Sequence, residues 1–130
     1  MIALDTNAII DIFKKDNKIL SLINNLNEDL CSSIINYQEI MFGLNLENLK
    51  HITEENFYDN FFEGIFIFLL DISSSKKSTG ILWNLKKEGR IVDKSDCMIA
   101  GILLANGVNK IITKNIKHFE HIPGLKVVSY

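Results

Sequence analysis

The chain begins Met1-Ile2-Ala3-Leu4-Asp5-Thr6-Asn7, an apolar run that stops abruptly at three polar residues. This pattern is typical of a short buried strand that ends at the edge of a sheet. Similar apolar runs recur along the chain. Together they predict strands at residues 1–4, 30–33, 64–70, 110–113 and 126–128.

Helical spacing fills the segments between these runs. Asn17, Ser73 and Lys94-Ser95 are the expected helix starts, and Gly89 and Gly107 are the expected ends. Strands that alternate with helices predict the α/β class, with a mainly parallel sheet covered on both faces. Apolar residues recur every three or four positions in four sets: Ile19, Ile23 and Leu26; Tyr37, Ile40, Met41 and Leu44; Ile81, Leu82 and Leu85; Ile99, Ile102 and Leu103.

Polar and acidic residues follow several of the predicted strands. Ligands of parallel sheets bind beyond the carboxyl ends of the strands. Residues as far apart as Asp5 and Asn115 are therefore expected to meet at one edge. The residues sent there are Asp5, Thr6 and Asn7 after the first strand, Ser32 and Ser33 at the end of the second, Glu39 in the helix that follows, Thr113 and Asn115 after the fourth, and Asp96 at the start of the helix leading back to it.

Carboxylates gathered at one edge repel one another unless protons or cations intervene. Oxygen ligands favour Mg²⁺ or Mn²⁺ over zinc, and Mg²⁺ is usually shared with substrate phosphates, which indicates phosphoryl chemistry. Each residue also has a simpler interpretation. Asp5 fits a helix cap, Asp96 fits a first-turn charge that favours the helix dipole, and Glu39 fits a solvated helix residue. His118 and His121 lack a third ligand nearby, which indicates surface histidines.

The composition indicates one compact domain over residues 1–130. With 47% apolar residues and a net charge of −2, the chain does not fit the disordered class. No apolar run is long enough to cross a bilayer, and the N-terminus does not resemble a signal peptide. Cys31 and Cys97 lie in apolar segments, which favours free thiols in a reducing cytoplasm.

Charge is divided unevenly along the chain. Residues 1–74 carry 4 Lys and 12 Asp or Glu, a net of −8, whereas residues 75–130 carry 10 Lys or Arg and 4 Asp or Glu, a net of +6. Such a division suits a site that holds cations and faces a polyanion, although ordinary solvated surface is the simpler interpretation. Six of the twelve aromatic residues lie between Phe57 and Phe68, as core or as a partner surface.

Around the polar and acidic residues that follow the predicted strands, the sequence resembles PIN-domain ribonucleases of the VapC toxin type. Four motifs carry the likeness in the family's order over nearly the whole chain. They are Leu4-Asp5-Thr6-Asn7; Ser32-Ser33-Ile34 with Glu39, Ile40 and Gly43; Gly89-Arg90-Ile91 with the run Asp96 to Gly101; and Ile112 to Asn115 with His118-Phe119 and Ile122 to Leu125.

The resemblance implies an α/β/α sandwich around a mainly parallel sheet, a homodimer, and cleavage of RNA that depends on Mg²⁺ or Mn²⁺. It also implies an antitoxin protein encoded alongside. Asp5, Glu39 and Asp96 match the family's catalytic metal ligands. Many relatives carry a fourth Asp where this chain has Asn115, so less charge is available for a second ion. Asp93 is a possible substitute for that charge.

Other residues are expected to assist. Thr6 and Thr113 are expected to orient ligands or water as outer hydroxyl groups. A basic set flanks the third and fourth motifs and is expected to contact RNA phosphates, which position a nucleic acid without reading its sequence. The set is Lys86, Lys87, Arg90, Lys94, Lys114 and Lys117.

Rival functions lack necessary residues. A haloacid-dehalogenase phosphatase needs a second Asp where this chain has Asn7, and a receiver domain that used Asp71 would need an acidic pair in place of Asp5-Thr6. The chain also has no G-x-x-x-x-G-K-[ST], G-x-G-x-x-G, G-x-S-x-G, C-x-x-C or H-E-x-x-H motif. Two alternatives stay open: a free-standing PIN nuclease that processes RNA, and a catalytically degenerate PIN fold that acts as a binding module.

Overall fold

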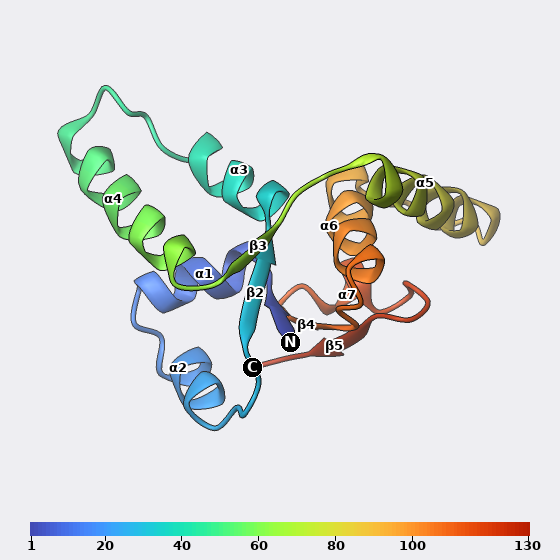
Figure 1. The fold of residues 1–130 in the computed structure, drawn as a ribbon, viewed down its shortest axis with the longest axis horizontal. Helices are drawn as coiled ribbons and strands as arrows, with labels where there is room; N and C mark the ends of the chain where they lie inside the picture. Colours follow the sequence, from blue (N-terminus) through green and yellow to red (C-terminus); the bar gives the residue numbers. More distant parts are fainter.

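Five parallel strands form one sheet at the centre of the computed structural model, which describes all 130 residues (Figure 1). The strands are β1 (Ile2–Leu4), β2 (Leu30–Ser33), β3 (Phe66–Phe68), β4 (Lys110–Ile112) and β5 (Lys126–Val128). Each lies within a run that the sequence predicts. Their order across the sheet is β3-β2-β1-β4-β5, so the chain steps outward from β1 first on one side and then on the other. The switch between the two directions lies beside β1, where parallel sheets bind ligands.

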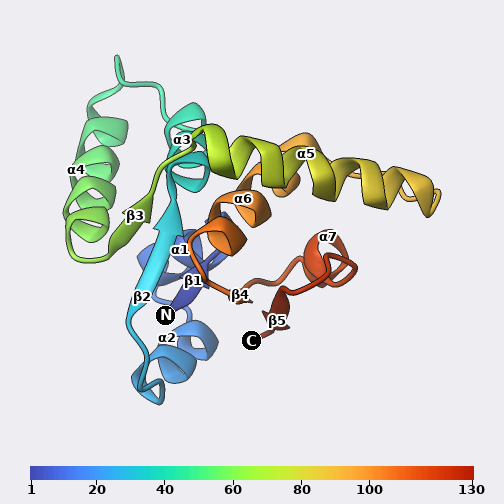
Figure 2. The same cartoon turned by 45° about the vertical axis from the view of Figure 1, so that its right-hand side comes forward.

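Seven helices connect the strands. They are α1 (Thr6–Phe13), α2 (Asn17–Asn24), α3 (Ile34–Phe42), α4 (Leu49–Glu63), α5 (Ile72–Lys87), α6 (Lys94–Ala105) and α7 (Ile116–Phe119). None is both long and apolar enough to cross a membrane. Figure 2 shows α5 extending over α6 and away from the sheet.

The two faces of the sheet have separate cores because successive strand residues point in opposite directions. Ile2 and Leu4 of β1, with Ile112 of β4, pack against α1, α2, α3 and α4. Ala3 of β1, with Ile111 of β4, packs against α5, α6 and α7. The predicted α/β/α sandwich with a parallel sheet is therefore confirmed.

The ends of the helices agree in part with the expected signals. Gly89 and Gly107 follow α5 and α6 with φ values of 74° and 76°, which glycine adopts without strain. The start of α5 differs from the expectation at Ser73. Asp71 caps this helix instead, in a reciprocal pair with Ser74.

The sequence does not predict helix α4 or the short helix α7, and α4 is the longer of the two. The apolar residues of α4 are not gathered on one clear stripe, so the periodic signal is missing. Tyr58 and Phe62, four positions apart, are buried in the core, whereas Phe57 and Phe66 remain exposed. The aromatic run therefore serves partly as core and partly as surface.

Candidate active site

Asp5 follows β1 directly and lies at the carboxyl edge of the sheet. Its backbone N–H donates to the carbonyl of Ile112 over 3.0 Å, which fixes the residue beside β4. Its side chain is only 5% exposed and makes no capping bond to α1. The carboxylate instead accepts hydrogen bonds from Asn36 Nδ2 at 3.2 Å and from Thr113 Oγ1 at 2.7 Å. Asp5 therefore occupies the N-cap position of α1, but its carboxylate does not cap the helix.

Asn36 organises one side of this edge, and the sequence analysis did not identify it. The residue is 1% exposed, and its Nδ2 donates to Asp5 and also to Thr6 Oγ1 at 3.1 Å. Its Oδ1 accepts from Ser33 Oγ at 2.6 Å. A sequence signal does exist, because Ser33 and Asn36 have the spacing of a capping box at the start of α3.

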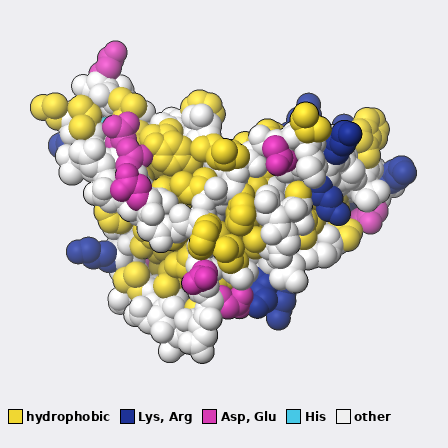
Figure 3. Space-filling model, viewed as in Figure 1, with side chains coloured by type: hydrophobic (Ala, Val, Ile, Leu, Met, Phe, Trp, Pro, Cys, Tyr) yellow, Lys and Arg dark blue, Asp and Glu magenta, His cyan; other side chains and the backbone are white.

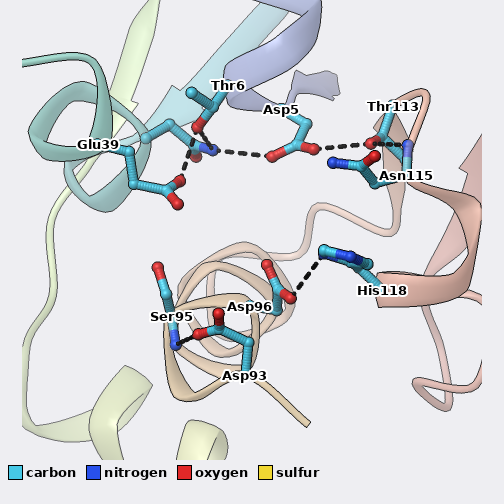
Figure 4. Close-up of polar contacts among 10 residues, drawn as sticks. Asp5, Thr6, Glu39, Asp93, Ser95, Asp96, Thr113, Asn115 and His118 are labelled. Atoms are coloured by element: carbon cyan, nitrogen blue, oxygen red, sulfur yellow. Dashed lines mark hydrogen bonds and ion pairs between the residues drawn. The ribbon is translucent and has the colours of Figure 1, made fainter. Parts of the chain in front are cut away.

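Glu39 joins the same network one turn later in α3. Thr6 Oγ1 donates to Glu39 Oε1 over 2.7 Å (Figure 4). A continuous chain of hydrogen bonds therefore runs from Ser33 through Asn36 and Thr6 to Glu39. Asp5 and Glu39 are thus linked through Asn36 and Thr6 although 34 positions separate them. Glu39 is not a freely solvated helix residue.

Asp96 approaches the edge from the first turn of α6, facing the other carboxylates (Figure 4). It is 9% exposed, and its Oδ2 lies 3.0 Å from Nδ1 of His118 on α7. His118 is exposed, as the sequence indicates, with half of its side chain accessible, but it also contacts a buried carboxylate. No local spacing signals this contact, because it depends on how α7 packs against α6.

Two further residues occupy the margin of the site. Asp93 is exposed and caps α6 by accepting from the backbone N–H of Ser95 at 2.8 Å. The backbone N–H of Asn115 donates to Thr113 Oγ1 at 2.9 Å, which orients the hydroxyl that contacts Asp5. The Asn115 side chain makes no capping bond to α7 and lies close to Thr113 in Figure 4.

Burial and mutual repulsion disfavour the ionised carboxylates. Burial raises the pKa of Asp5, against the lowering effect of the Thr113 hydrogen bond. Burial and the charges of Asp5 and Asp93 raise the pKa of Glu39. For Asp96, burial and the neighbouring acids raise the pKa to about 6, although His118 opposes the change. A cation would relieve all three at once.

The donor set is chemically suited to a hard divalent cation. Carboxylate and amide oxygens are the ligands that Mg²⁺ and Mn²⁺ prefer. They are supplied here by the residue after β1, by α3 and α6, and by the segment after β4. As the side chains stand, no three acidic, histidine or cysteine groups surround one point as an ion requires.

The six basic residues predicted to contact RNA differ in their surroundings. Lys114 Nζ pairs with Asp11 at 2.6 Å and lies over the ring of Tyr130, whose hydroxyl also donates to Asp11. Arg90 pairs with Glu88 at 3.0 Å. The remaining four, Lys86, Lys87, Lys94 and Lys117, form no ion pair. Figure 3 shows basic side chains gathered around α5 and acidic ones along α4.

Known proteins share both the sequence pattern and the fold. The PIN domain family matches residues 2–125. A protein of Salmonella typhimurium named tRNA(fMet)-specific endonuclease VapC is 27% identical over 125 residues, which cover 95% of this chain and 93% of that protein. A chain of DNA-bound VapBC from Salmonella typhimurium has a TM-score of 0.84 at 26% identity, covering 98% of this chain and 96% of that one. A chain of VapBC2 from Rickettsia felis, bound to a DNA fragment from their promoter, has a TM-score of 0.86 at 24% identity, covering 100% and 99%. This chain therefore belongs to the PIN domain family.

Proposed function

We propose that this protein is an endoribonuclease that depends on Mg²⁺ or Mn²⁺, that residues 1–130 form one nuclease domain, and that it is the toxin of a toxin–antitoxin pair. The observation that carries the proposal is the convergence of Asp5, Glu39 and Asp96 at the carboxyl edge of the sheet. Two of them are buried, and none forms an ion pair with a lysine or arginine. Buried acids without such partners are common at catalytic sites.

In this proposal Asp5, Glu39 and Asp96 hold the ion, with Asn115 and Asp93 as auxiliary oxygen donors. A bound divalent ion would lower the pKa of a water molecule and offset charge that develops on the phosphodiester. The protein's own contribution is orientation. The amide of Asn36 and the hydroxyls of Thr6 and Thr113 hold carboxylate oxygens in place, as outer-shell groups do in metal sites.

RNA phosphates would be held by the basic residues near α5 and α7. Lys86 and Lys87 lie in the last turn of α5 and form no ion pair, so both are available to a polyanion. Replacing both with alanine should weaken RNA binding and reduce the slope of log binding constant against log salt by about 1–2. Lys126→Ala is the control, because Lys126 is exposed at the start of β5 and forms no ion pair. An unchanged slope would show that Lys86 and Lys87 are ordinary surface residues.

A broad apolar surface supports the proposal that this chain binds protein partners. Large apolar side chains are exposed at the end of α3, along α4 and at the start of α5, and Figure 3 shows apolar side chains across the hollow between these helices. Soluble monomers rarely expose such patches. Homodimer formation and antitoxin binding would cover it, and the structures of VapBC complexes support an antitoxin partner. The exposed residues at these places are Phe42, Leu49, Ile52, Phe57 and Ile72.

The place of action in this proposal is the cytoplasm. Cys31 and Cys97 are buried and free, which fits a reducing compartment.

The deciding experiment is cleavage of total RNA by the purified chain. Mn²⁺ or Mg²⁺ should support cleavage and chelator should stop it, while Asp5→Asn, Glu39→Gln and Asp96→Asn should each reduce the rate at least about a hundredfold. Asp29→Asn, at the amino end of β2, is the control. Full cleavage by a folded Asp96→Asn protein would contradict the proposal. Cleavage without growth arrest on expression would identify a free-standing nuclease, and binding without cleavage would identify a binding module.

A further inference from the structure

A second hollow lies immediately beside the acidic edge. It has a volume of about 520 Å³ and is enclosed by the end of α5, the segment 89–92 and residues 117–122. This volume is in the range of sites that bind small molecules and nucleotides. None of the three carboxylates of the candidate active site lines it.

His118 connects the hollow to the active site. The imidazole lines the hollow, and its Nδ1 lies 3.0 Å from Asp96 Oδ2. Lys117, the preceding residue, lines the hollow and forms no ion pair. A nucleic acid whose phosphodiester lay at the acidic edge would therefore pass the mouth of the hollow.

The lining combines apolar side chains with flat polar groups. Leu85, Val92 and Ile122 supply apolar surface, while the guanidinium of Arg90 and the imidazole of His121 supply planar surfaces. Both polar groups already face carboxylates, since Arg90 Nε lies 3.0 Å from Glu88 and His121 Nε2 lies 3.1 Å from Glu120. The positive charge of Arg90 is therefore partly offset, so Arg90 and His121 offer planar faces for stacking.

We propose that this hollow binds one unpaired base of single-stranded RNA, next to the phosphodiester held at the acidic edge. The proposal rests on the proposed ribonuclease function and adds a subsite to it. Proteins that read single-stranded RNA stack splayed bases on aromatic rings or arginine planes. A base in a duplex cannot enter such a hollow, so the subsite selects an unpaired nucleotide.

Binding of two synthetic RNAs with equal charge tests the proposal. One is a ten-nucleotide uridine oligomer and the other is its abasic counterpart, and fluorescence anisotropy with chelator present measures their affinities without cleavage. Stacking of one base should make the uridine oligomer bind roughly 5- to 150-fold more tightly. Arg90→Lys keeps the charge but removes the plane, so it should reduce this ratio at least about threefold. Lys126→Ala, at the start of β5, is the control and should leave the ratio unchanged.

The position of the base is tested separately. A uridine oligomer that carries 4-thiouridine should crosslink to residues 89–92 or 117–122 of the wild-type chain. Equal affinity for the two oligomers, an unchanged ratio in Arg90→Lys, or crosslinks only elsewhere would overturn the subsite. Base-dependent binding by a chain that cleaves no RNA would overturn the ribonuclease function and leave the subsite standing. Failure of the wild-type chain to bind either oligomer would overturn the subsite, whereas the ribonuclease function is tested separately by cleavage with Mn²⁺ or Mg²⁺.

Discussion

Replacing Asp96 with asparagine should stabilise the metal-free protein at neutral pH. Burial, together with the charges of Asp93, Asp5 and Glu39, raises the pKa of Asp96 from 3.8 to about 6 in the folded state. The native state therefore binds more protons than the unfolded state between about pH 4 and pH 6, and stability falls as the pH rises through this window. At about 1.36 kcal/mol for each pKa unit, the ionised carboxylate destabilises the fold by about 3 kcal/mol above pH 6. The side chain is 13% exposed, so solvent screens little of this effect.

Asparagine cannot ionise, but it leaves His118 without a charged partner. We therefore expect the free energy of unfolding of Asp96→Asn to exceed that of wild type by about 1–3 kcal/mol at pH 7 with chelator. Near pH 4 this difference should disappear. Urea denaturation followed by circular dichroism measures the difference. A change of 3 kcal/mol in the free energy of unfolding moves the midpoint of urea denaturation by about 1–3 M urea. Asp29→Asn, in an exposed position at the amino end of β2, is the matched control.

A bound metal ion should reverse the order of stability of wild type and Asp96→Asn. Only wild type retains all three carboxylates, and an ion at a hundred times its dissociation constant stabilises a folded protein by about 2.7 kcal/mol. Added Mn²⁺ should therefore raise the wild-type midpoint above that of Asp96→Asn. Equal destabilisation of the variant at both pH values, with and without Mn²⁺, would refute the reasoning and leave Asp96 as a structural residue of α6.

Two further predictions concern residues that hold the site and its helices. Asn36→Leu leaves the buried partners of this amide unpaired, so it should cost about 1–3 kcal/mol in urea denaturation and weaken Mn²⁺ binding in calorimetry. Unchanged Mn²⁺ affinity in the folded variant would contradict the positioning role. Gly101→Ala should cost about 1–3 kcal/mol, because an added Cβ lies 2.7 Å from Ser78 on α5. A Cβ added at Gly80 meets no atom within 4 Å, so Gly80→Ala should raise the free energy of unfolding by about 0.5–1 kcal/mol. Equal effects of the two alanine substitutions would show that α5 and α6 are not closely packed at Gly101.

Most elements of the fold, and the identity of the acidic residues at the edge of the sheet, can be predicted from local sequence. A buried strand requires a short apolar run, and a parallel sheet requires polar residues where each strand ends, so the run from Met1 to Asn7 carries both signals. The same reasoning brings Asp5, Glu39 and Asp96 to one edge. The segment that holds α4 has no comparable signal, because its apolar residues do not repeat along one stripe.

The tertiary structure decided how the carboxylates are held. Whether Asp5 caps a helix or accepts from Asn36 and Thr113 depends on side chains that meet only after β1, α3 and β4 have packed. The contact between His118 and Asp96 likewise depends on the packing of α7 against α6. The sequence by itself determined which residues reach the edge of the sheet, because strand periodicity and polar strand ends are properties of neighbouring residues. Only the folded structure decided which side chains touch there, because hydrogen bonds between distant residues depend on the relative positions of whole helices and strands.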